Sequence, residues 1–162
     1  MDADALLSHW HAGVREMHIA HSKAAAHYDR MNVVFGVPVV IFTTGVGTAV
    51  FASINSSPDP VLQVVVGFFS VAAAVLASLQ TFLRYAERAE KHHTAIARWG
   101  ALRRKIEHLQ VVRPVESEKL DELLASLQSQ WDALENESPT VPQRFQDRAI
   151  EKIRQERAKA SE

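Results

Sequence analysis

Two uncharged runs decide the fold: MNVVFGVPVVIFTTGVGTAVFASI at Met31–Ile54 and VLQVVVGFFSVAAAVLASLQTFL at Val61–Leu83. Both runs are apolar all around a helix rather than along one stripe. A helix of this length, with its rise of 1.5 Å per residue, reaches about 35 Å, enough to cross a hydrocarbon core of ~30 Å. The intervening NSSPDP, Asn55–Pro60, has the composition of a turn. The runs are predicted to form a transmembrane hairpin, in preference to two helices buried in a soluble bundle.

Charge is distributed very unevenly along the chain. The 162 residues contain 18 Lys or Arg and 19 Asp or Glu, for a net charge of −1, yet Asp59 is the only charge between Arg30 and Arg84. The near-neutral balance excludes a bulk electrostatic basis for nucleic-acid binding. The absence of cysteine excludes disulfides, thiolate zinc sites and cysteine nucleophiles.

Positive charges flank the two runs on one side only. Arg15, Lys23 and Arg30 precede the first run, seven Lys or Arg follow the second between Arg84 and Lys105, and the turn has none. The positive-inside rule therefore predicts that both termini are cytoplasmic and the turn is outside. The first 30 residues show no cleavable signal peptide.

Three apolar stripes with alternating three- and four-residue steps predict helices outside the membrane. They run from Leu6 to Tyr28 (through His21), from Tyr85 to Leu109 (through His92) and from Leu120 to Leu134. Trp10, Trp99, Leu127 and Trp131 occupy stripe positions and are predicted to anchor a bundle or an oligomer. The stripes pack either within one chain or between chains, and the charged segment 144–162 is either a short peripheral helix or a frayed tail.

The predicted fold is all-α, a two-transmembrane hairpin with a cytoplasmic helical bundle or coiled-coil extensions. No proline interrupts residues 61–112, so the second membrane helix is expected to continue as one helix into the cytoplasm. The expected segments are an amphipathic helix over 1–30, membrane helices over 31–54 and 61–83, a cytoplasmic extension over 84–112 and C-terminal helices over 114–162.

The titratable residues give little indication of chemistry. His18 and His21 have a helical spacing that can bind a metal, but no carboxylate-rich motif accompanies them, so they are expected to be solvated or satisfied in the bundle. Histidine titrates near neutrality, which leaves a pH-sensing role open, although the sequence gives no positive sign of it. Glu87 and Glu90 have the spacing of surface ion pairs. The sequence predicts no catalytic residue, metal or cofactor and no enzymatic activity.

Small and hydroxyl-bearing residues interrupt the apolar runs. The candidates for lining a pore or packing helices are Thr43, Thr44, Thr48, Ser70, Ser78 and Gln80. Either the hydroxyls bond their own backbone carbonyls, or several hairpins assemble and these residues face a wet lumen. Two helices cannot enclose a pore, so a conducting form must be an oligomer, and without charged lining residues it would select poorly among ions. Pro38 is expected to kink the first membrane helix.

Residues 20–112 resemble the SLATT family, the SMODS- and SLOG-associating two-transmembrane effector proteins of bacteria. The most specific parts are the Asn32–Gly36–Pro38 pattern and LASLQTFLRYAERAEKH at Leu76–His92. The resemblance implies a bacterial inner-membrane effector of an antiviral conflict system. It also implies a nucleotide-synthase or nucleotide-sensing protein as a partner.

The leading hypothesis is an effector that contacts membrane lipid, forms a homo-oligomer and permeabilises the inner membrane when a partner or nucleotide signals. The alternative is a membrane-anchored coiled-coil scaffold that recruits protein partners without conduction. A third hypothesis is a selective channel gated by a ligand.

Overall fold

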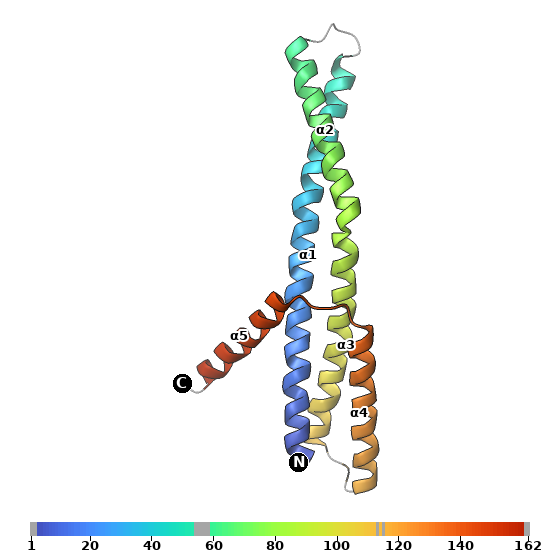
Figure 1. The fold of residues 1–162 in the computed structure, drawn as a ribbon, viewed down its shortest axis with the longest axis vertical. Coiled ribbons are helices and arrows are strands. Elements are labelled where there is room, and N and C mark those ends of the chain that lie inside the picture. The colour runs from blue at the N-terminus through green and yellow to red at the C-terminus, as the bar shows by residue number, and fades with distance from the viewer. Residues whose placement is uncertain (1–2, 54–58, 113, 115, 161–162) are drawn as a thin grey trace. The chain divides into compact units, whose positions relative to one another are not determined.

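The computed structural model describes residues 3–53, 59–112, 114 and 116–160, and within these residues every regular element is an α-helix (Figure 1). The elements are α1 (Ala3–Ser53), α2 (Pro60–Leu83), α3 (Tyr85–Val111), α4 (Ser117–Glu137) and α5 (Gln143–Ala160). The all-α prediction is confirmed. The predicted turn at residues 55–58 lies outside the described residues.

The helices fall into two compact units. The first, here called the bundle unit, consists of Met1–Ala26 and Ala89–Glu162, which contain the first part of α1, most of α3, and all of α4 and α5. The second, here called the hairpin unit, is His27–Arg88, which contains the rest of α1, all of α2 and the first turn of α3.

Helix α1 joins the predicted amphipathic helix and the first apolar run without a break over 51 residues. It continues through Pro38, whose ring nitrogen cannot donate to the carbonyl of Val34. The kink expected at Pro38 stays a prediction.

Helix α2 begins at a cap that the sequence encodes locally. The Asp59 carboxylate accepts a hydrogen bond of 2.8 Å from the backbone N–H of Val61, and Pro60 occupies the first turn, where its missing N–H costs nothing. Asp59, the single charge between Arg30 and Arg84, therefore caps the first turn of α2.

Helix α2 ends at Leu83 because Arg84 adopts the left-handed conformation, with φ 49° and ψ 42°. The expectation of one helix through residues 61–112 is therefore wrong at this residue. The Arg84 N–H still donates to the Gln80 carbonyl at 3.2 Å, and the Arg84 carbonyl accepts from the Arg88 N–H at 3.1 Å, so the interruption is one residue long. A left-handed residue with a Cβ costs about 1–2 kcal/mol.

The bundle unit has one core, to which α1, α3 and α4 contribute. Trp99 is 1% exposed at its centre, and its ring meets that of Trp131 edge-to-face, with centroids 5.5 Å apart. Residues 143–160 form a helix, and Phe145 and Ala149 are buried beneath it, so the charged C-terminal segment is a peripheral helix rather than a frayed tail.

Candidate functional site

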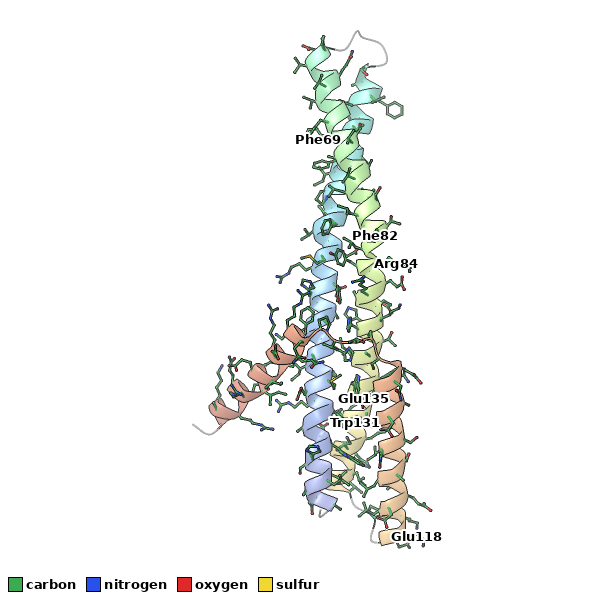
Figure 2. The ribbon with its side chains drawn as sticks, viewed as in Figure 1. Phe69, Phe82, Arg84, Glu118, Trp131 and Glu135 are labelled. Carbon is green, nitrogen blue, oxygen red and sulfur yellow. The ribbon has the colours of Figure 1, made fainter. Side chains whose placement is uncertain are left out.

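The hairpin unit exposes most of its apolar side chains. Helix α1 and the segment from α2 through α3 are long and apolar enough to cross a membrane. In their most apolar 18-residue windows, 0% and 6% of residues are buried. Helices in the core of a soluble bundle would be mostly buried. The low burial of these two windows therefore argues against the alternative of two helices buried in a soluble bundle within one chain. Phe82, on the last turn of α2, is 81% exposed (Figure 2).

Aromatic, small and amide side chains meet between the two membrane-length helices. The rings of Phe42 and Phe69 have centroids 5.0 Å apart, and Ala73 is buried. A Cβ placed on Gly36 would lie 3.1 Å from Nε2 of Gln80, so the glycine makes room for the amide. Gln80, one of the predicted pore-lining residues, therefore lies at the contact between the two helices of the hairpin.

The predicted hydroxyl residues bond within their own helices. The hydroxyl of Thr43 donates to the Val39 carbonyl at 2.8 Å, and that of Thr48 to the Thr44 carbonyl at 2.9 Å. Ser70 and Ser78 likewise donate to the carbonyls four residues earlier, both at 2.8 Å. These four residues and Thr44 are exposed on the surface of one chain. The hydroxyls are satisfied without water, and a neighbouring chain or lipid can still contact them.

Three glycines of the hairpin have room for a side chain among the described residues. A Cβ on Gly45, Gly47 or Gly67 would meet no atom within 4 Å. Packing inside one hairpin therefore does not require these glycines, unlike Gly36.

Aromatic rings gather where α2 gives way to α3. Tyr85 stacks between Tyr28 and Phe35, with centroid distances of 6.2 and 5.7 Å. Beside them the Arg84 guanidinium pairs with Glu87 at 2.8 Å. The left-handed Arg84 thus lies directly before the ring that completes this stack.

The four predicted anchors all lie in or against the core of the bundle unit. Trp99 and Leu127 are buried, and Trp10 and Trp131 pack against them while half-buried. A Cβ on Gly13 would lie 2.6 Å from Cη2 of Trp131, so glycine is needed there for the indole to fit. The Trp131 indole N–H donates to Glu135 at 3.2 Å (Figure 2).

A buried histidine pair joins α1 to α3 inside the bundle unit. Nδ1 of His21 lies 2.9 Å from Nδ1 of His92, and the two residues are 0% and 3% exposed. Burial, with smaller contributions from His92 and His18, lowers the pKa of His21 from 6.5 to about 4. Burial also lowers the pKa of His92, and the nearby His93 adds to that shift.

Sequence reasoning missed this pair but contained a sign of it. His21 and His92 both occupy positions of apolar stripes, where a buried side chain is expected, whereas the spacing argument linked His21 to His18. Within the described residues, no group of three or more metal-ligating side chains comes together. The 2.9 Å separation of the two Nδ1 atoms is that of a hydrogen bond, in which one imidazole donates and the other accepts.

The fold and this geometry define an all-helical protein with two helices able to cross a membrane. Comparison with protein-family models, with curated proteins and with solved structures finds no match to this chain. The SLATT resemblance stays a prediction.

Proposed function

We propose that this protein is a bacterial inner-membrane effector of an antiviral conflict system. Its hairpins assemble with those of other copies and open or disrupt the membrane when a partner protein or a nucleotide signals to the bundle unit. Both termini and the bundle unit lie on the cytoplasmic side, as the positive charges flanking the hairpin favour.

The observation that supports this proposal most is the uncovered apolar surface of the hairpin unit. Bulky side chains stay exposed along both helices, including Val40, Ile41, Phe51, Val64, Phe68 and Phe82. In water this surface would be far larger than the apolar patches that soluble monomers tolerate. Lipid, other hairpins or both must therefore cover it.

The small residues of the hairpin support assembly with other copies. Membrane helices associate where small residues allow backbones to approach closely. Gly45, Gly47 and Gly67 leave open space, since an added Cβ would meet no atom of the described residues within 4 Å, and packing among those residues does not require glycine there. A second hairpin seated against them would supply the missing packing.

Leakage from liposomes tests the effector function. The full chain, reconstituted into vesicles that enclose a self-quenching dye, is expected to release the dye with a steep dependence on protein density. Gly45→Leu should reduce release because it blocks close approach, whereas Val64→Leu, an apolar exchange at an exposed position, should not. Full dye retention by wild type at every density, both in vesicles and after adding the lysate of a phage-infected host, contradicts the proposal.

A scaffold function is the second candidate, and the hydroxyl geometry favours it. Thr48 and Ser70 are already satisfied by their own helix, as expected where no lumen exists. In a scaffold, Thr48→Leu and Ser70→Leu leave biological activity intact, whereas disrupting Trp99 abolishes it. In a pore, the two leucine variants change conductance while the bundle stays folded.

A further inference from the structure

The buried residues that flank the two histidines in sequence are small. The buried neighbours of the pair in sequence are alanines on both helices: Ala20, Ala24, Ala25, Ala89 and Ala95. The large core side chains that α1 contributes, Leu7 and Val14, lie earlier in the chain. Each alanine side chain buries little apolar area, so the histidines are the largest buried side chains over residues 20–25 of α1 and 89–95 of α3.

The position of one proton in the pair follows from which nitrogens have partners. Two neutral imidazoles joined through their Nδ1 atoms share a single hydrogen, so one donates and the other accepts. Nε2 of His21 is buried and has no hydrogen-bond partner among the described residues. If that atom carried a hydrogen, a buried donor would be unsatisfied, so the favoured tautomer of His21 carries its hydrogen on Nδ1 and donates to Nδ1 of His92.

Neither imidazole can take a second proton without breaking this arrangement. A proton on Nδ1 of His92 sets N–H against N–H across 2.9 Å and removes the hydrogen bond. A proton on Nε2 of His21 creates a buried cation whose new N–H has no acceptor.

We propose that the His21–His92 pair is an acid-sensitive latch between α1 and α3, closed while the two imidazoles share one proton and opened when a second proton binds. His21 lies six residues before the hairpin unit begins and His92 lies four after it ends, so the latch joins the helices where both leave the bundle unit. The latch belongs to the bundle alone and stands whether or not the hairpin conducts.

The charged groups around the pair act in the same direction. His18 on α1 faces His21, and His93 on α3 faces His92. Behind His18 lie Arg103 and Arg104 of α3 and Lys152 of α5. His18 and His93 are positive when charged, so each disfavours a second proton on the closed pair, whereas the two arginines and the lysine lower the pKa of His18 itself.

The direction of the pH effect follows from proton binding in the two states. In the open state His21 regains its ordinary pKa of 6.5, while in the closed state its pKa is about 4. As the pH falls, His21 therefore binds a proton at a higher pH in the open state than in the closed state. The closed state is fully favoured only above pH 6.5. Through His21 alone, the ratio of open to closed forms rises ~80-fold between pH 6.5 and 4, toward a limit of ~300-fold from well above pH 6.5 to well below pH 4.

Spin labels on the two helices test the latch directly. The chain has no cysteine, so Ser22→Cys with Thr94→Cys places one label on an exposed position beside each histidine. We expect one narrow distance distribution at pH 7.5 in nanodiscs and a second, longer population that grows as the pH falls from 6.5 to 4. His21→Leu with His92→Leu should remove this response, and His108→Gln, at an exposed histidine of α3, should keep it.

A second measurement needs no histidine variant. Nitrogen NMR of the wild-type imidazoles at pH 7.5 should find both rings neutral, with the hydrogen of His21 on Nδ1. The latch is refuted if the distance distribution stays unchanged down to pH 4, if the double leucine variant keeps the wild-type response, or if either ring is an imidazolium at pH 7.5.

Discussion

The bundle unit contains polar side-chain pairs between helices as well as within them, whereas serine and threonine hydroxyls of the hairpin unit bond within their own helices. In the bundle unit, polar groups pair across helices: His21 with His92, His11 with Glu107 at 3.1 Å, and Arg98 with Glu137 at 2.5 Å. In the hairpin unit, the hydroxyls of Thr48, Ser70 and Ser78 donate to backbone carbonyls of their own helices. Cross-helix pairing fixes one arrangement of helices, whereas satisfaction within each helix leaves the helices free to change neighbours.

The apolar side chains differ in the same way. The bundle unit buries its large aromatic ring, Trp99, and the hairpin unit exposes Phe82. The bundle is therefore stabilised by contacts within one chain, and we propose that lipid or other chains cover the hairpin. This comparison predicts that equivalent substitutions have large effects in one unit and small effects in the other.

Truncating a large aromatic side chain should give the largest difference. Trp99→Ala removes a buried indole and should lower the free energy of unfolding of the bundle unit by about 3–5 kcal/mol. Phe82→Ala, at an exposed position, should change the free energy of unfolding of the hairpin unit by less than about 0.5 kcal/mol. Denaturant titration followed by far-UV circular dichroism, which reports the helices of both units, measures both. Equal losses would mean that the hairpin is packed as tightly as the bundle.

The second-largest effect is expected from acidification, which should lower the free energy of unfolding of the bundle unit. The pKa of His21 is about 4 in the folded state and 6.5 when unfolded, so the unfolded state binds the proton more tightly. Stability is full above pH 6.5 and falls as the pH drops toward 4, by up to about 3 kcal/mol through this residue. Denaturation midpoints of the bundle between pH 7.5 and 4 measure the loss. His21→Leu with His92→Leu should flatten this part of the profile.

Replacing one glycine of each unit by alanine should have opposite effects on stability in the bundle unit and the hairpin unit. Gly13→Ala places a Cβ 2.6 Å from the Trp131 ring and should destabilise the bundle by about 1–3 kcal/mol. Gly45→Ala meets nothing within 4 Å and should stabilise its helix by up to about 1 kcal/mol. Thermal unfolding in detergent compares the two variants. A destabilising Gly45→Ala would reveal a close contact at that glycine made by another chain.

Features encoded by neighbouring residues could be predicted from the sequence. The uncharged runs predicted both membrane-length helices, and the stripes predicted that Trp99 and Leu127 would be buried. In contrast, the contact of Gln80 with Gly36 and the pairing of His21 with His92 depend on which faces of distant segments meet. Stripe positions showed that these histidines face a core, but not which residue each would meet.

The interruption at Arg84 could not be predicted for a different reason. Left-handed residues are usually signalled by glycine or asparagine, and arginine carries no such sign. The stack of Tyr85 with Tyr28 and Phe35, together with the Arg84–Glu87 ion pair, lies around the interruption and stabilises it. The ion pair is local to the first turn of α3, but the aromatic stack forms only once the hairpin has folded.

The smallest expected effect lies at this residue, which ends the last helix of the hairpin. Arg84→Gly removes the penalty of a Cβ in the left-handed conformation, whereas Arg84→Ala keeps that penalty and loses the same charge. The glycine variant should therefore be more stable than the alanine variant by about 1 kcal/mol, and the exposed ion pair with Glu87 contributes at most about 0.5 kcal/mol to either difference from wild type. Thermal unfolding in nanodiscs measures the order of the three proteins. If the alanine variant is the more stable, α2 and α3 form one continuous helix when Arg84 is replaced, and the left-handed turn depends on the arginine side chain rather than on the packing around it.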